Sequence, residues 1–255
     1  PGRKVLILLL LLISLPSTSA FGQKKLTIAA ENDWYPYTAE RNGNIEGWGV
    51  DVIRSAYAAV GIEVNFVALP CTRCLHEVSI NAQLGCFNVV KDVSTGPRFL
   101  FHKIPIYTNQ TGIYAMKTSK VPLNVKPTDL EGYTVGYTNG YTYGDYLMET
   151  TKIKKSYAIN DISNLKMLAL NRHQYSLIGT FNASFLLHQY RKDFTELPVL
   201  AGVLDEQPLY VAFSKSNKLA QYAARKLDQG LKILKASGEY KRIKQKWDDK
   251  FQVVP

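Results

Sequence analysis

Acidic and aromatic side chains occur together between Glu31 and Asp51, directly after an apolar run that predicts a strand at 26–30. A helical pattern at 52–60 follows this segment. Loops at the carboxyl ends of strands are where open α/β sheets bind ligands, and small-molecule pockets combine apolar walls with a few polar groups. Glu31 and Trp34 could therefore contact a small solute. The alternative is an ordinary surface loop with one buried tryptophan.

The first twenty residues have the organisation of a secretory signal peptide. Arg3 and Lys4 precede the apolar run 5–15, and small residues lead to Ala20. We predict cleavage near Ala20, which would leave 235 of the 255 residues, enough for two lobes of ~100 residues each. The predicted location is the periplasm.

Cysteine chemistry is a second candidate. Cys71 and Cys74 form a C-x-x-C pair at the predicted start of a helix at 72–80, and Cys86 is the third cysteine. A helix start would stabilise a thiolate, so redox chemistry is possible there. In an exported protein we instead expect a local Cys71–Cys74 disulfide or buried thiols. No second Cys or His pair stands at zinc-ligand spacing, so we predict no metal site.

Basic residues exceed acidic ones, with a formal net charge of +10. Many of the lysines lie in the last two predicted helices, at spacings that favour a solvated face. No nucleic-acid recognition motif accompanies the charge, so we expect no nucleic-acid partner.

Predicted strands and helices alternate along the rest of the chain, which is typical of α/β proteins with a mainly parallel sheet. Two such series occur, separated by extended segments and a linker at 121–129 that contains two prolines. The first has strands at 62–69 and 85–90. The second has strands at 133–137 and 175–179, with helices at 143–150, 162–170 and 183–190, and is followed by an extended segment at 209–213, a long helix at 218–235 and a last helix from Gly238.

Six motifs in this order resemble those of family 3 periplasmic solute-binding proteins, the type that serves polar amino-acid ABC importers. Each motif alone is weak, but the ordered set covers nearly all of the mature chain. The motifs are Trp34-Tyr35-Pro36-Tyr37; Gly47-Trp48-Gly49-Val50-Asp51; Pro70 with Arg73-Cys74-Leu75; Arg98 with Phe101 and Pro105-Ile106-Tyr107; Leu130 to Gly136 with Asn139-Gly140; and Gly238-Glu239-Tyr240 with Ile243 and Trp247.

The resemblance implies a type II periplasmic binding protein fold. Each of its two lobes would be a mainly parallel sheet flanked by helices, and two crossing strands would form the hinge. Lobe 1 would comprise residues 21–109 and 208–255, and lobe 2 residues 110–207. A ligand would bind between the lobes and favour their closure.

The resemblance also suggests how a carboxylate would be bound. Arg98 matches the family's carboxylate-binding arginine, but the loop from Asn88 to Arg98 is longer than usual, so Arg73 is the other candidate. A surface ion pair is the alternative for either arginine. In lobe 2, Gly140, Tyr141 and Thr142 match the segment that binds the same carboxylate.

One departure concerns the ligand's amino group. Thr180 stands where the family has an aspartate that pairs with an α-ammonium. A neutral side chain leaves a buried ammonium without a charged partner, which is costly. Glu31 could supply the acid, or the ligand is not an ordinary α-amino acid. We expect Glu31, Trp34, Arg73, Asn88, Arg98, Gly140, Tyr141, Thr142 and Thr180 to contact the ligand.

The predicted function is capture of a small polar ligand, an amino acid or related carboxylate, for delivery to the membrane permease of an ABC importer. We expect a monomer without a cofactor. A periplasmic enzyme on this fold, such as a dehydratase, is an alternative, but no ordered nucleophile motif supports catalysis. A sensor whose loaded form is read by a membrane receptor is the other alternative.

Overall fold

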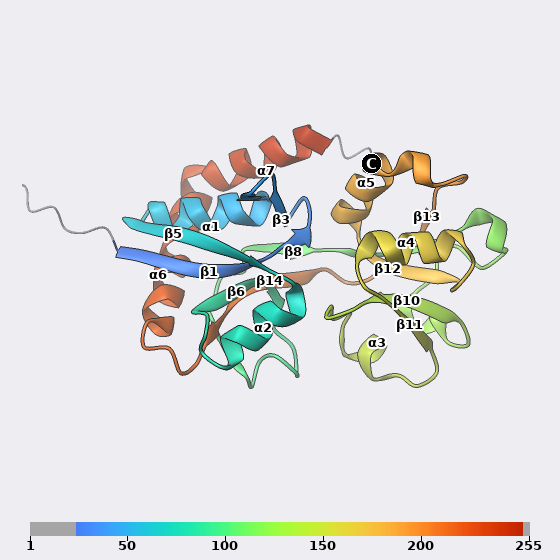
Figure 1. The fold of residues 1–255 in the computed structure, drawn as a ribbon, viewed down its shortest axis with the longest axis horizontal. Coiled ribbons are helices and arrows are strands. Elements are labelled where there is room, and N and C mark those ends of the chain that lie inside the picture. The colour runs from blue at the N-terminus through green and yellow to red at the C-terminus, as the bar shows by residue number, and fades with distance from the viewer. Residues whose placement is uncertain (1–23, 252–255) are drawn as a thin grey trace, which may run out of the picture.

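The computed structural model describes residues 24–251, which form two α/β lobes side by side (Figure 1). The predicted signal peptide lies outside the described residues. Among the described residues, no helix is both long enough and apolar enough to cross a membrane.

The first lobe contains a six-stranded sheet in which β1 lies between β5 and β6. Its strand order is 5-1-6-14-7, with the eighth strand paired to the fourteenth. The strands are β1 (Lys24–Glu31), β5 (Ile62–Leu69), β6 (Gly85–Val90), β7 (Phe99–Phe101), β8 (Tyr107–Asn109) and β14 (Gln207–Ser214).

Both faces of this sheet are covered. Side chains alternate along a strand, so Ile28 and Ala30 of β1 pack in the core under one helical layer, while Ala29 packs in a separate cluster with the opposite helix. The first layer is formed by α1 (Trp48–Ala58), α6 (Ala220–Ser237) and α7 (Glu239–Phe251), and the opposite helix is α2 (Cys71–Ser79).

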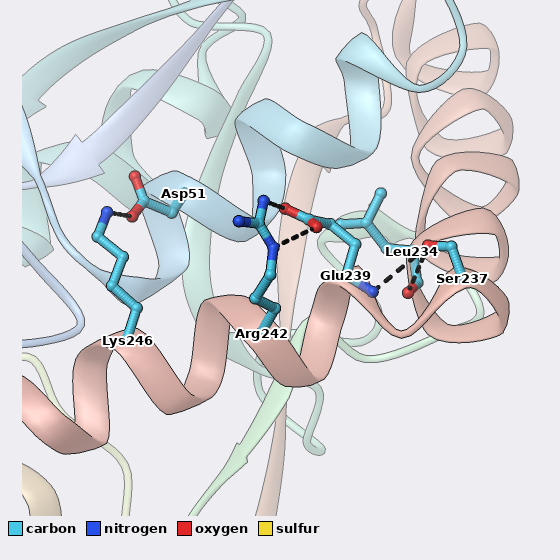
Figure 2. Close-up of polar contacts among 6 residues, drawn as sticks. All are labelled: Asp51, Leu234, Ser237, Glu239, Arg242 and Lys246. Carbon is cyan, nitrogen blue, oxygen red and sulfur yellow. Dashed lines mark hydrogen bonds and ion pairs between the residues drawn. The ribbon is translucent and has the colours of Figure 1, made fainter.

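Figure 2 shows how α7 is fastened to α1. Asp51, in the first turn of α1, accepts a hydrogen bond from Lys246 Nζ at 2.8 Å. Outside the residues drawn there, Trp247 Nε1 donates to the same carboxylate at 2.9 Å. At the start of α7, Arg242 makes a two-pronged ion pair with Glu239 at 2.8 Å. The bonds to Asp51 thereby fix the C-terminal helix beside the first turn of α1.

The second lobe contains a five-stranded sheet with the order 11-10-12-9-13. Its strands are β9 (Thr111–Ala115), β10 (Thr134–Thr138), β11 (Lys154–Ala158), β12 (Tyr175–Gly179) and β13 (Val199–Val203). Its helices are α3 (Asp145–Glu149), α4 (Asp161–Ala169) and α5 (Thr180–Gln189), with short 3₁₀ turns at Lys117–Ser119, Pro127–Leu130 and Arg191–Asp193.

The chain crosses between the lobes twice, within a short distance. Only Gln110 separates β8 from β9, and residues 204–206 separate β13 from β14. The two crossings are hydrogen-bonded, because Leu204 N donates to Thr111 O at 2.8 Å. The proposed lobe boundaries fall near these crossings and stay a prediction.

Both sheets are mixed, whereas the sequence predicted mainly parallel ones. β1 is parallel to β5 and β6, and β10 is parallel to β11 and β12. However, β14 is antiparallel to its neighbours, and so is β9. These are the strands that enter a lobe from the other one, so their direction is set by the crossings.

Some elements differ from the predicted ones. The helix expected at 143–150 is confined to α3, because Gly144 precedes it with a φ of +85°. The edge strand β11 was not predicted, because its sequence is mostly polar and it pairs only with β10. A small sheet of β2 (Asp33–Trp34), β3 (Thr38–Arg41) and β4 (Asn44–Glu46) was also not predicted.

The segment Trp34–Tyr37, here called the aromatic loop, lies against the start of α1. Trp48 N donates to Pro36 O and Gly49 N to Tyr37 O, both at 2.9 Å, so the loop's carbonyls satisfy amides of the helix start. Gly47 makes this contact possible, because a Cβ there would lie 2.2 Å from Tyr37 O. Its φ of +149° also favours glycine.

The disulfide joins Cys74 of α2 to Cys86 of β6, with Cα atoms 5.9 Å apart, and Cys71 is free. The expected Cys71–Cys74 disulfide is therefore wrong. Cys74 is fully buried on the helix face that covers the sheet, whereas the Cys71 thiol lies 3.7 Å from Gly140 O of the second lobe.

We expect Gly47→Ala to destabilise the protein more than Gly43→Ala. Gly43 also has a positive φ, +75°, but no atom lies within 4 Å of its added Cβ. The control should lose only the left-handed strain of about 1–2 kcal/mol, while the Gly47 variant must also displace the aromatic loop. Urea unfolding would measure both, and equal losses would contradict the close contact.

We expect a reductant to lower the Tm of the wild type and of Cys71→Ala equally. In the chain-entropy account a short disulfide loop contributes about 3 kcal/mol, and each kcal/mol corresponds to about 2–4 °C in a chain of this size. Cys74→Ala should start lower and not respond to reductant. A Cys71→Ala protein that is insensitive to reductant would show that Cys71 is in the bond.

Candidate ligand-binding site

A cavity of about 70 Å³ lies between the two lobes. Lobe 1 contributes the carboxyl ends of β1 and β6, and lobe 2 contributes the loop after β10 and the end of β12. The lining residues are Glu31, Trp34, Cys71, Leu75, Cys86, Phe87, Asn88, Val89, Val90, Thr95, Asn109, Thr111, Gly140, Tyr141, Thr142, Tyr143, Gly179, Gln207 and Leu209.

Glu31 connects the lobes across this cavity. It is the last residue of β1 and only 7 % exposed. The Tyr141 hydroxyl of lobe 2 donates a hydrogen bond of 2.5 Å to Glu31 Oε1. Thr38 Oγ1 donates to the Glu31 backbone carbonyl at 3.1 Å, which ties the end of β1 to the small sheet. The carboxyl group is thus held at the cavity by both lobes.

Burial raises the pKa of Glu31 to about 8, because the charged form is desolvated. The bond from Tyr141 opposes the rise, while the negative charges of Asp161 and Asp33 add to it. Burial likewise raises the pKa of Asp161 to about 7. Without a positive partner, Glu31 is therefore largely protonated at neutral pH.

The Cys71 thiol has no features of a redox centre. Burial raises its pKa well above the usual value, and the negative charges of Glu31 and Asp161 raise it further. A reactive cysteine needs a lowered pKa. This environment favours the protonated thiol.

The aromatic loop supplies one wall. The Trp34 ring stacks on Tyr37 with centroids 4.2 Å apart and meets Tyr141 edge-on at 5.9 Å. The Tyr37 hydroxyl donates to Asn109 Oδ1 at 2.9 Å, at the first crossing between lobes. The loop therefore links the cavity wall to the crossing.

Asn88 of β6 lines the cavity and has an unpaired side-chain amide donor. Its backbone has a φ of +69°, and its Oδ1 accepts a short hydrogen bond from the Tyr107 hydroxyl. Asn88 Nδ2 is buried without a hydrogen-bond partner. The cavity thus presents an amide donor as well as the Glu31 acceptor.

Neither candidate arginine lines the cavity. Arg98 is exposed, and its guanidinium lies 5.0 Å from the centre of its neighbour Phe99. The turn before it is closed by Asp92, which accepts from Ser94 N and Thr95 N at 2.9 Å. The Arg73 side chain is 66 % exposed and makes an ion pair of 2.7 Å with Glu77, one helical turn away. Both arginines therefore make surface interactions: Arg73 forms an ion pair, and Arg98 lies over an aromatic ring.

Gly140, Tyr141 and Thr142 do line the cavity, together with Glu31, Trp34 and Asn88. Thr180 does not; it starts α5, and its backbone N donates to Gln110 O at 2.8 Å. Gly179, directly before it, lines the cavity instead. The end of β12 therefore reaches the cavity, as the sequence predicted, but Gly179 lines the wall and the Thr180 side chain does not.

Sequence reasoning missed several lining residues, notably Asn109, Thr111 and Gln207 at the crossings. Asn109 is buried and accepts from Tyr37. An asparagine between two predicted extended segments is a signal that could have been used, because a buried amide at a crossing needs partners from both sides.

The chemical character of the cavity follows from its lining. Within residues 24–251, the lining includes one acid, Glu31, and no lysine, arginine or histidine. No group of three or more His, Cys, Asp or Glu among the described residues could hold a metal ion. The arrangement provides a buried acceptor, hydroxyl and amide groups, and an aromatic wall.

We expect the Tm of ligand-free wild type to fall, relative to that of Glu31→Gln, as pH rises. The folded pKa of Glu31, about 8, lies above its ordinary value of 4.5. Its stabilising contribution is therefore complete below about pH 4.5 and is lost as pH rises through about 8. Exposed Glu40→Gln is the control and should track the wild type. Parallel curves for wild type and Glu31→Gln would contradict the raised pKa.

Comparison with known proteins identifies the family. The model of the bacterial extracellular solute-binding proteins, family 3, matches residues 26–250. A search of curated proteins finds no match.

Three solved structures illustrate the shared fold. A histidine kinase sensor domain similar to periplasmic binding proteins has a TM-score of 0.76 at 18 % identity, over 88 % of this chain and 96 % of that one. A mutant of the arginine-binding protein from T. maritima has a TM-score of 0.74 at 19 % identity, over 88 % and 95 %. The substrate-binding protein of an amino acid ABC transporter has 0.69 at 17 % identity, over 88 % and 98 %.

These matches confirm the resemblance drawn from the motifs and the two-lobed α/β fold. Members of the matching family bind solutes rather than transform them, so the prediction of a non-enzymatic protein is also confirmed. This chain belongs to family 3 of the bacterial extracellular solute-binding proteins.

Proposed function

We propose that the protein captures a small amine-bearing solute in the periplasm by closing its lobes, and delivers it to an ABC importer. The observation that carries the choice of ligand is Glu31, the one acidic residue in the cavity lining of the described chain. A buried carboxyl that bonds only a neutral hydroxyl is mostly uncharged. An ammonium beside it would ionise it and form a charge-assisted hydrogen bond.

The absence of Arg73 and Arg98 from the wall changes the expected ligand class. An α-carboxylate would meet no guanidinium there, and its donors would be the Asn88 amide and the segment Gly140–Thr142. Trp34 and Tyr141 suit the apolar or cationic part of the solute. We therefore favour a ligand recognised mainly through its amino group, ahead of the broader class of amino acids and carboxylates.

The importer is proposed as partner because the family serves solute uptake and the fold neighbours include the substrate-binding protein of an amino acid ABC transporter. We expect one monomer to bind one solute. The cavity of about 70 Å³ is small, so a larger ligand would require the lobes to close less tightly than they do here.

Calorimetry after a thermal-shift screen of amines, amino acids and carboxylates would test the proposal. We expect saturable binding of an amine, weakened about tenfold or more by Glu31→Gln, since a charge-assisted bond contributes about 1.5–3 kcal/mol. Arg98→Ala is the control and should bind as the wild type does. Preference for a carboxylate without an amino group, or loss of binding in Arg98→Ala, would contradict this assignment.

A sensor role is the second candidate, because a histidine kinase sensor domain shares this fold over 88 % of the chain. Deletion of the gene separates the two roles. Loss of radiolabelled ligand uptake supports import. Intact uptake with a lost transcriptional response to the ligand supports sensing.

A further inference from the structure

A second cavity, of about 120 Å³, lies between the lobes beside the aromatic loop. Trp34 lines the first cavity, whereas its chain neighbours Asp33 and Tyr35 line the second. Lobe 2 contributes Asp161, from the first turn of α4, and Asn182 of α5. None of these four residues belongs to the lining of the first cavity.

This second cavity contains unsatisfied acceptors. Among residues 24–251, the buried side-chain atoms without a hydrogen-bond partner include two carboxylate or amide oxygens, Asp161 Oδ2 and Asn182 Oδ1. Both residues line the second cavity, and they are 5 % and 2 % exposed. A buried acceptor without a donor is costly, so each needs an explanation.

The other atoms of these two side chains fix their orientation. Asn182 Nδ2 donates to Tyr35 O at 2.5 Å, and because a backbone carbonyl can only accept, the amide nitrogen must face it. Asp161 Oδ1 accepts from Thr138 Oγ1 at 2.5 Å. The unpaired oxygens are therefore held in place by their own side chains' bonds.

Neighbouring groups supply the missing donors only in part. The Trp34 indole interacts with the Asp161 carboxyl group and lowers its pKa, although Trp34 Nε1 and Asp161 Oδ2 form no hydrogen bond of regular geometry, and Asn182 Oδ1 has no partner. Arg41 is the basic residue of the wall, but its guanidinium stacks 4.1 Å from the ring centre of Tyr35 and 5.0 Å from that of Phe185. With Asp33 and Asp161, the wall carries two carboxyl groups against one guanidinium.

These features select the chemistry of an occupant. Two fixed acceptors and the nearby Asp33 carboxylate favour an occupant that carries a positive charge and several N–H donors. The Arg41 guanidinium on the rings of Tyr35 and Phe185 shows that this wall accommodates an organic cation. A cavity of about 120 Å³ is also much larger than a single metal ion needs, and a bound Ca²⁺ or Mg²⁺ ion would need six or more oxygen ligands.

We propose that the second cavity binds the ammonium or guanidinium group of a small organic cation, held by Asp161 and Asn182 of lobe 2 and by Asp33 of lobe 1. Because the cation contacts both lobes, it favours the closed arrangement. It therefore increases affinity for the solute of the first cavity, and that solute increases affinity for the cation by the same factor. This site does not depend on the identity of the first ligand.

Titration calorimetry with methylguanidinium chloride and with methylammonium chloride would test this site, each against sodium chloride at equal ionic strength. We expect saturable binding of at least one cation by the wild type. Asp161→Asn and Asp33→Asn should each weaken it about tenfold or more, since each removes a charge-assisted contact. The Asp33 side chain is exposed, so its variant tests the site without altering the core.

Two matched variants complete the test. Glu31→Gln should retain cation binding, because Glu31 lines only the first cavity. Asp193→Asn should retain it as well, because Asp193 is an exposed acid of lobe 2 that pairs with Lys166 and does not line the second cavity. Loss of binding in Glu31→Gln with retention in Asp161→Asn and Asp33→Asn would assign the cation to the first cavity and overturn the proposal. No saturable binding beyond sodium chloride, or binding of Ca²⁺ or Mg²⁺ in preference to both organic cations, would overturn it as well.

Discussion

The backbone contact between the aromatic loop and the start of α1 positions the rest of the molecule. The loop gives two carbonyls to the helix amides, and Gly47 allows it to lie that close. From this fixed point, Tyr37 reaches the first crossing through Asn109 and the Tyr35 carbonyl accepts from Asn182 of lobe 2. The same short segment therefore lines both cavities and contacts the first crossing and the second lobe.

The predicted ligand contacts that line the first cavity share a feature. Glu31 ends β1, Asn88 lies near the end of β6, and the segment Gly140–Thr142 follows β10. Such positions follow from the order of strands alone, because the ends of parallel strands meet at one edge of a sheet. Hydrophobic patterns predicted where these strands end, and the family resemblance then pointed to Gly140, Tyr141 and Thr142.

The features in which the structure differs from the sequence-based expectation depend on finer geometry. Arg98 has a long side chain whose direction is set by the turn that Asp92 closes, and Arg73 is held by Glu77 on its own helix. The cysteine pairing depends on which face of α2 covers β6. The antiparallel entry of β9 and β14 depends on the crossings. Each of these requires tertiary contacts that spacing along the chain does not encode.

The hydrogen bond from Tyr141 to Glu31 has a kinetic and thermodynamic consequence for solute exchange. It joins the lobes with a donor that belongs to the protein. A solute that enters must first find the open population and then compete with this internal donor for the carboxyl group. The measured affinity of a solute that displaces Tyr141 is reduced by the free energy of this internal bond. Weakening the internal bond would therefore tighten binding of any solute that does not itself use Tyr141.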